Sequence, residues 1–121
     1  MSNTYDMTGK KKIFQGSDKE VELVVKSDGS TPDDLTGFKA RMMIRQSVKD
    51  DAVLDELTTE NDRIVITPGE GKVVLKFPSS VTEYYDFTRG VYDLELVSDG
   101  DPEVVTRLLQ GVVEVDLEVT R

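Results

Sequence analysis

Oxygen-bearing side chains gather in one short segment, Asp28-Gly29-Ser30-Thr31-Pro32-Asp33-Asp34. Because Ca²⁺ takes roughly six to eight oxygen ligands, such a cluster is compatible with a calcium loop. The spacing of an EF-hand is absent, since the twelfth position counted from Asp28 is Lys39 rather than glutamate. Asp and Gly are also the residues that ordinary turns favour. We interpret the segment as a solvated loop and expect no metal, with a calcium site as the alternative.

Two carboxylates, Asp93 and Glu95, lie on one face of an expected strand. Glycosidases use two carboxylates, but acidic residues on the solvent face of a strand are ordinary. The chain has no Cys and no His, which excludes the usual zinc ligand sets, cysteine nucleophiles, Ser-His-Asp triads and histidine bases. The sequence contains no phosphate loop and no nucleophile elbow. We therefore expect no catalytic residues, no cofactor and no enzymatic activity.

Charge and hydropathy exclude two further classes of function. Lys plus Arg is 15 and Asp plus Glu is 24, so the net charge is −9. An acidic chain lacks the basic surface that nucleic-acid binding needs. No apolar run approaches the roughly 20 residues that span a bilayer. We expect neither nucleic acid nor membrane as a partner.

Alternation of apolar and polar residues predicts strands along most of the chain. The turns between them contain Gly, Asp and Pro, as in the hairpin turn expected at Asp99-Gly100-Asp101-Pro102. In the C-terminal strand, Gly111 predicts a bulge or bend. A short helical turn is expected within 78–88. The predicted fold is all-β, an immunoglobulin-like antiparallel β-sandwich of about eight strands with one short helical turn. The expected strands cover 20–26, 38–46, 53–58, 63–67, 72–77, 91–97 and 103–120.

The alternation also predicts which residues are buried. We expect a flexible N-terminal arm over residues 1–12, with a first edge strand as the alternative, and a single sandwich domain over 13–121. The expected core consists of Val21, Leu23, Val25, Phe38, Met42, Ile44, Ile64, Ile66, Val73, Leu75, Phe77, Tyr92, Leu94, Leu96, Val113 and Val115.

Two segments are candidates for contact with other proteins. Of the clustered aromatic residues, Phe87 and Tyr92 are expected in the core, whereas Tyr84 and Tyr85 are candidates for an interface, where tyrosine is enriched.

In the N-terminal arm, Tyr5 and Met7 are the expected anchors. Lys10, Lys11 and Lys12 would face an acidic surface, such as Glu114, Asp116 and Glu118 of a neighbouring copy. We expect this arm to be mobile in the isolated subunit and ordered only against a partner.

Several segments together resemble small structural proteins of tailed bacteriophages and prophages, and the N-terminal β-sandwich domain of phage baseplate upper proteins. The resemblance covers Ile13 to Arg121. Unlike the longer baseplate proteins, this chain ends at Arg121, directly after a strand, which favours a stand-alone subunit. The segments are Ile13-Phe14-Gln15-Gly16, Asp28-Gly29, Asp33-Asp34-Leu35-Thr36-Gly37-Phe38, Arg41-Met42-Met43-Ile44-Arg45, Gly90-Val91-Tyr92-Asp93-Leu94-Glu95-Leu96, Val105-Thr106-Arg107-Leu108-Leu109-Gln110-Gly111, Val115 and Val119-Thr120-Arg121.

The resemblance implies a non-enzymatic virion protein of the tail, baseplate or neck, made in the host cytoplasm. Its partners would be other virion proteins, with many copies in a symmetric assembly. A capsid decoration or head-fibre protein is one alternative. A receptor-binding or carbohydrate-binding module is another, and the absence of Trp counts against it.

Overall fold

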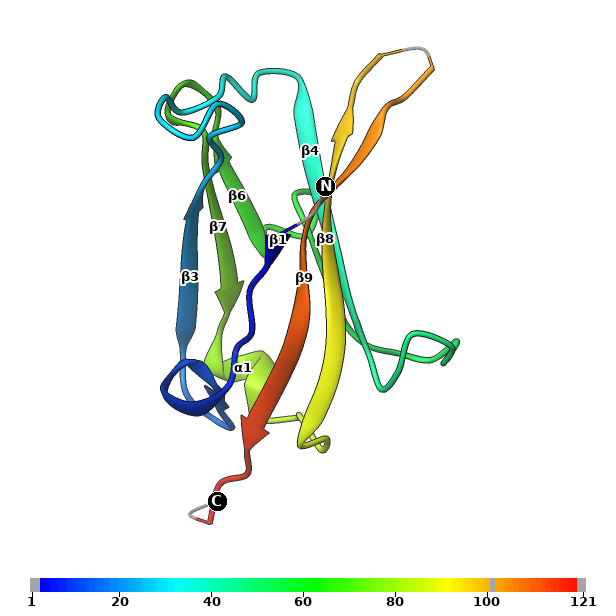
Figure 1. Ribbon diagram of the computed structural model, residues 1–121. Coiled ribbons are helices and arrows are strands. Elements are labelled where there is room, and N and C mark those ends of the chain that lie inside the picture. Colours follow the sequence, from blue (N-terminus) through cyan, green and yellow to red (C-terminus); the bar gives the residue numbers. More distant parts are fainter. Residues whose placement is uncertain (1–2, 101, 120–121) are drawn as a thin grey trace.

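A computed structural model describes residues 3–100 and 102–119. Two β-sheets face each other with the hydrophobic core between them (Figure 1). One has six strands and the other has three, and we call them the large and the small sheet. The predicted all-β class with one short helical turn is confirmed.

The large sheet is built on four antiparallel strands in the order β9-β8-β4-β5. The N-terminal segment adds two short strands, β1 and β2, which pair with β9 in parallel. The expectation of a purely antiparallel arrangement is wrong at this edge, because the N-terminal segment runs beside β9 in the same direction. The strands are β1 (Asn3–Thr4), β2 (Ile13–Phe14), β4 (Phe38–Arg45), β5 (Val53–Thr58), β8 (Arg89–Ser98) and β9 (Val105–Asp116).

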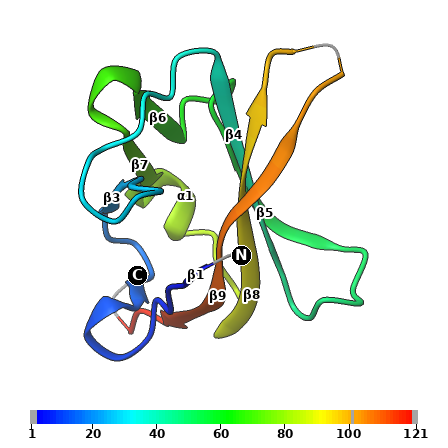
Figure 2. The same cartoon turned by 45° about the horizontal axis from the view of Figure 1, so that its top comes forward.

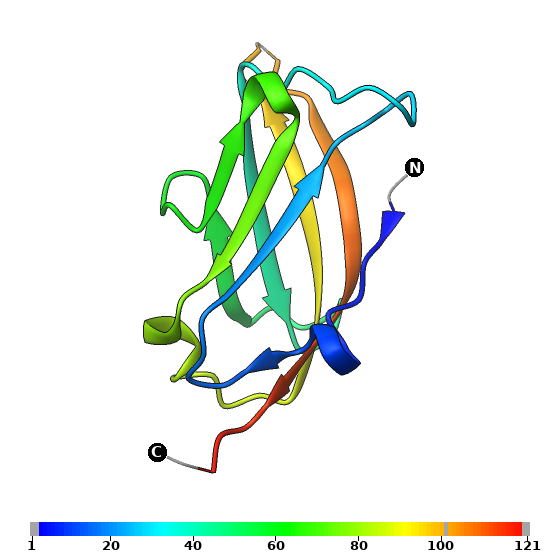
Figure 3. The ribbon, with the colours of Figure 1, turned by 90° about the vertical axis from the view of Figure 1, so that its left-hand side faces the viewer.

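The small sheet contains β3 (Lys19–Val24), β7 (Lys72–Phe77) and β6 (Ile64–Thr67), with β7 in the middle. All three strands are antiparallel to their neighbours. Figure 3 shows this sheet in front of the large one, with the N-terminal segment to the side of β3, next to β9. The sheet therefore leaves two seams where its edge strands, β3 and β6, meet the large sheet.

Helical structure is short. The α-helix α1 covers Ser79–Thr82, and single 3-10 turns occur at Gly9–Lys11 (η1) and Pro68–Glu70 (η2). No helix in the described ranges is long and apolar enough to cross a membrane.

The predicted core is largely confirmed. Twelve of its sixteen residues are buried, and the other four are half-buried and pack against the core. The half-buried four are Leu23, Val25, Phe38 and Ile66. Three of them, Leu23, Val25 and Phe38, line one groove at the seam between β3 and β9.

Gly111 has a different role from the one expected. The register of β9 shifts between Arg107 and Leu109, opposite Glu95 and Leu94, so the bulge residue is Leu108. At Gly111 the backbone of Tyr5 passes close to β9, and an added Cβ would lie 2.2 Å from the Tyr5 carbonyl oxygen. The glycine therefore makes room for the N-terminal segment.

Two hairpins extend beyond the facing sheets (Figure 2). One joins β4 to β5 and the other joins β8 to β9. The β8–β9 hairpin carries exposed apolar side chains at Val104 and Val105.

Candidate functional site

The expected anchors of the N-terminal arm lie within their own subunit. Met7 is 0% exposed and its backbone N–H donates to the carbonyl of Val112 at 2.8 Å. Tyr5 donates its backbone N–H to the carbonyl of Gln110 at 2.9 Å, and its own carbonyl accepts the hydroxyl of Tyr92. Burying Met7 under the edge of β9 favours an ordered segment, whereas the mobility of the arm in the isolated subunit stays a prediction. In this conformation Met7 is not accessible to a neighbour.

One lysine of this segment, Lys12, faces the acidic stripe within its own chain. Nζ of Lys12 lies 3.1 Å from the carboxylate of Asp116. Lys11 lies over the ring of Tyr5 at 4.9 Å, and Lys10 is exposed. The backbone N–H of Gly9 donates to Glu114 at 3.2 Å. Of the three lysines, Lys10 remains the most open to a partner.

Tyr84 and Tyr85 have opposite environments. Tyr84 is 79% exposed, so it remains a candidate contact residue. Tyr85 is buried, its ring centroid lies 4.9 Å from that of Phe87, and its hydroxyl donates to Asp55. Tyr85 therefore belongs to the interior of its own chain, as Phe87 and Tyr92 do.

The loop that raised the possibility of calcium uses its carboxylates in local turns. Asp28 accepts the backbone N–H groups of Ser30 and Thr31, at 2.9 and 2.7 Å. Asp34 accepts the hydroxyl of Thr36 at 2.6 Å and its N–H at 3.0 Å. These hydrogen bonds lower the pKa of both carboxyls. Among residues 3–100 and 102–119, no group of three metal-binding side chains occurs.

The carboxylates Asp93 and Glu95 are each next to an arginine. Glu95 accepts from Nε of Arg41 at 2.8 Å, and Asp93 lies 3.7 Å from Nε of Arg107. The two acids therefore face cations rather than each other. The second pair joins Arg107 of β9 to an acid on the adjacent strand β8.

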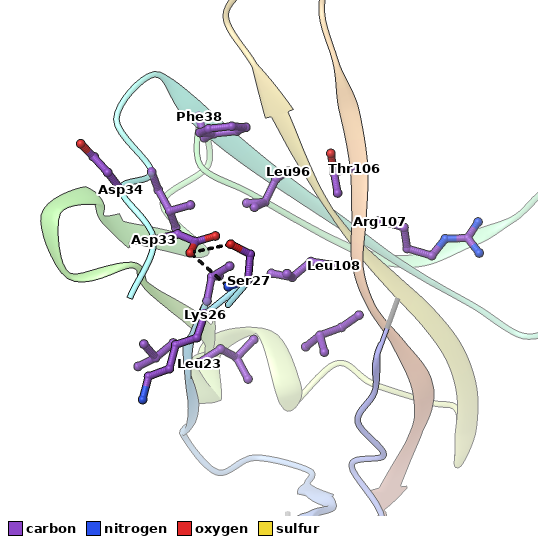
Figure 4. Close-up of a pocket in the computed structure, with 14 residues that line it drawn as sticks. Leu23, Lys26, Ser27, Asp33, Asp34, Phe38, Leu96, Thr106, Arg107 and Leu108 are labelled. Carbon is purple, nitrogen blue, oxygen red and sulfur yellow. Dashed lines mark hydrogen bonds between the residues drawn. The ribbon is translucent and has the colours of Figure 1, made fainter. Parts of the chain in front are cut away.

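The candidate site is an open groove of about 850 Å³ along the seam between β3 and β9. It follows the N-terminal end of β9, which is uppermost in Figure 1 and is called the upper part of β9 below. Its apolar surface comes from both sheets, and a polar rim surrounds it (Figure 4). In Figure 4, Leu96 and Leu108 point toward the middle of the groove, whereas Arg107 points to the other side of β9. The main apolar residues are Leu23, Val25, Leu35, Phe38, Leu96, Leu108 and Leu109, and the rim includes Lys26, Ser27, Asp33, Asp34, Thr106 and Arg107.

The outer wall of the groove is fixed by backbone hydrogen bonds. Asp33 donates its N–H to the carbonyl of Val25 at 2.8 Å, and its carboxylate accepts from N–H and Oγ of Ser27. Leu35 donates to the carbonyl of Pro68 at 3.0 Å. These contacts hold the loop after β3 away from β9, which leaves the apolar floor accessible.

No protein-family model and no curated protein matches this chain. The site is therefore interpreted from its geometry. An elongated apolar groove bordered by two strand edges has the shape and surface to bind an extended peptide segment, through side chains in the groove and backbone hydrogen bonds at an edge.

The opposite seam, between β5 and β6, is closed by a polar network. Arg63 donates from Nη2 to Asp55 at 2.7 Å and from Nε to the carbonyl of Lys76 at 2.8 Å. Both charged side chains are 13% exposed. Burial acts to lower the pKa of Arg63, but Asp55 outweighs it, so the pKa is raised. Burial, followed by Asp55, raises the pKa of Tyr85.

Sequence reasoning missed both seams. The signal for the closed seam was present, because Asp55 shares its strand face with the buried Leu57. An acid on an apolar face indicates a buried partner, but the sequence does not identify Arg63 as that partner. The groove had no comparable signal, since the alternation of Leu109, Val113 and Val115 places Leu108 on the outer face, whereas Leu108 lines the groove at the bulge.

Proposed function

We propose that this chain is a non-enzymatic structural protein of a tailed-phage virion, an immunoglobulin-like sandwich subunit of the tail, baseplate or neck. It would be made in the host cytoplasm and incorporated with other virion proteins. Two facing sheets over one core support the immunoglobulin-like description. The resemblance of segments such as Ile13–Gly16 and Gly90–Leu96 to phage structural proteins supports the virion assignment.

The observation that carries a docking role is the open groove beside β3 and β9. Its apolar residues come from both sheets, and Leu23, Val25, Phe38 and Leu108 are only partly covered by the chain itself. Burying such surface against a neighbour is favourable at about 25 cal/mol per Å². The groove is thus a surface where a neighbouring virion protein gains stability by binding.

The binding energy of one such contact is modest, and the assembly would multiply it. In a symmetric particle each copy repeats the same contact, so weak single interactions combine into a stable structure. No chemical step is required of the chain. Tyr84, 79% exposed near α1, would offer a second contact at the other end of the molecule.

The test uses purified particles from a host that carries the gene. We expect the chain in the particles by mass spectrometry, and cryo-EM density for it in the tail, baseplate or neck. Density on the capsid surface would instead support a decoration or head-fibre protein. Absence from the particles would contradict a virion role.

A variant tests the groove itself. Leu108→Asp places a charge on the half-buried wall and should abolish incorporation while the purified protein still folds. The matched control is Val65→Asp, which places the same charge on an exposed apolar position of β6 in the small sheet. Normal incorporation of Leu108→Asp would show that the particle contact lies elsewhere.

A further inference from the structure

The upper part of β9 has one paired and one unpaired edge. On the paired side, Val105 lies opposite Val97 and Thr106 opposite Leu96 of β8. On the other side, the described part of the N-terminal segment begins its pairing only at Leu109. Residues 105–108 therefore have no strand beside them among the described residues, and such an edge is a template for another strand.

The backbone groups on this edge point outward in a regular pattern. Val104 donates its N–H to Oγ of Ser98 at 2.9 Å and accepts the N–H of Ser98 at 3.0 Å, so its backbone faces β8. Because the direction alternates along a strand, the N–H and C=O groups of Glu103, Val105 and Arg107 face away from β8. Val104 and Val105 also expose apolar side chains, at 59% and 47%.

The charges on this edge are arranged symmetrically about Val105. The sequence Glu103-Val104-Val105-Thr106-Arg107 has an acid at one end and a base at the other. Alternation puts Glu103 and Arg107 on the same, outer face of the large sheet. The acids Glu95, Glu103 and Asp93, with Glu95 dominant, raise the pKa of Arg41 on that face, which agrees with this placement of Glu103.

We propose that this edge pairs with the same edge of a second copy of the chain, antiparallel and around a two-fold axis at Val105. Val105 then lies opposite Val105 of the second copy. Arg107 lies opposite Glu103 of the second copy, and the symmetry repeats this ion pair on the other side of the axis. Outward backbone groups of Glu103, Val105 and Arg107 meet their counterparts in hydrogen-bonded positions.

Charge repulsion disfavours the shifted registers of this strand pair. Shifting the strands so that Arg107 or Glu103 meets itself opposes like charges directly across the ladder, which is destabilising. Among the described residues, Glu103 has no ion-pair partner in its own chain, and Arg107 has a loose one, 3.7 Å from Asp93. Both side chains are therefore available to the second copy.

The same pairing places side chains over the groove. Thr106 lines the groove, and Val104 shares its face by alternation. In the proposed register, Val104 of the second copy lies opposite Thr106 and so borders the upper part of the groove. A strand contact of this length buries less than the roughly 1,000 Å² typical of stable interfaces, so the dimer should be weak in solution.

The test is the mass of the purified chain over a wide range of protein concentration, by sedimentation velocity or light scattering. We expect a reversible dimer that forms as concentration rises. Arg107→Glu should raise the dissociation constant by about tenfold or more, since it replaces two attractive pairs with two repulsive ones. Glu103→Arg should do the same. Glu60→Arg, the same charge change in the β5–β6 turn, should leave it unchanged.

The double variant Glu103→Arg with Arg107→Glu restores opposite charges in the proposed register, and should return the dissociation constant to within about threefold of the original. Val105→Pro removes an outward N–H that β8 does not use, so it should abolish the dimer while the chain still folds. A chain that is monomeric at every concentration would overturn the proposal, as would a dimer that Arg107→Glu leaves intact or that the double variant fails to restore. Because particles are not involved, this outcome is independent of the virion assignment.

Discussion

The two seams of this protein are closed by different means. Between β5 and β6, Asp55, Arg63 and Tyr85 form a buried network that fastens the large sheet to the small one. Between β3 and β9, the N-terminal segment covers the lower half and nothing in the described chain covers the upper half. One seam is thus closed by polar contacts, whereas the other leaves apolar surface accessible.

Each seam also contains one buried tyrosine whose hydroxyl donates a hydrogen bond across the seam. Tyr85 donates to Asp55 in the closed seam, and Tyr92 donates to the carbonyl of Tyr5 under the N-terminal segment. Both contacts connect parts of the chain that are distant in sequence. Loss of either hydrogen bond would loosen one seam and leave the other intact.

The largest expected effect comes from removing the N-terminal segment. Met7→Ala should reduce the free energy of unfolding by about 2–5 kcal/mol, because Met7 is fully buried. Deleting residues 1–11 should cost more, since it also exposes the edge of β9. A mobile arm, as expected from the sequence, would instead leave the free energy of unfolding unchanged when deleted.

Urea unfolding measures both changes, with Lys10→Ala as the control. Lys10 is exposed, so its substitution should change the free energy of unfolding by less than about 0.5 kcal/mol. If the truncated chain unfolds at the same urea concentration as the complete one, the lower half of the β3–β9 seam does not depend on the segment.

The next effect comes from the closed seam. Asp55→Ala leaves Arg63 and the hydroxyl of Tyr85 without their shared partner in a largely buried site. We expect a loss of about 3 kcal/mol, the lower end of the range for breaking a buried pair. Glu95→Gln is the matched control, because it weakens an ion pair of similar length, 2.8 Å, on the exposed face.

Thermal or urea unfolding of the two variants gives the comparison directly. The exposed pair should contribute less than about 1 kcal/mol. Equal losses in the free energy of unfolding for Asp55→Ala and Glu95→Gln would mean that the Asp55–Arg63 pair contributes no more than an exposed ion pair. That result would contradict a buried network in the closed seam.

The sequence predicted the strands well because alternation acts locally. Val53–Thr58 and Lys72–Phe77 were predicted at their observed bounds, and Leu94 and Val73 are buried as expected. What alternation does not encode is which distant segments meet. Met7 alternates only with Tyr5, a stretch too short to predict a buried strand, and its burial depends on the path of the segment along β9.

The same limit explains why a bulge or bend was predicted at Gly111 and why the bulge at Leu108 was not predicted. A glycine inside a strand indicates a bulge or a close backbone approach, and only the position of Tyr5 decides between them at Gly111. At the bulge, Leu108 and Leu109 follow each other between Arg107 and Gln110, which breaks the alternation without showing which leucine is the extra residue. The candidate groove therefore depends on tertiary features that the sequence alone does not specify.

A smaller effect is the pH dependence of the free energy of unfolding, to which each seam contributes through one tyrosine. Burial raises the pKa of Tyr85 and of Tyr92 above the ordinary value of 10.0. Above pH 10 the unfolded chain ionises these hydroxyls while the folded chain keeps them protonated, so stability should fall as pH rises and be unaffected by them below pH 10. In Tyr85→Phe the fall between pH 9 and 11 should be shallower, as about one proton fewer is linked to unfolding.

Urea unfolding at several pH values measures this slope, and Tyr84→Phe is the control because Tyr84 is exposed. A slope in Tyr85→Phe equal to that of the unsubstituted chain would indicate that the closed seam already admits water at Tyr85. Tyr92→Phe repeats the measurement for the seam under the N-terminal segment, which allows the two seams to be compared by one observable.

The smallest expected effect concerns the loop that borders the open seam. Asp28 and Asp34 direct carboxylate oxygens at backbone N–H groups, and Asp33 binds Ser27, so the loop keeps its shape through hydrogen bonds of its own. A calcium ion would have to compete with these donors for the same oxygens. We therefore expect the melting temperature to be the same with EDTA and with millimolar calcium. A rise of several degrees with calcium would mean that the wall of the groove is shaped by an ion, and the open seam would then be a regulated surface rather than a permanently accessible one.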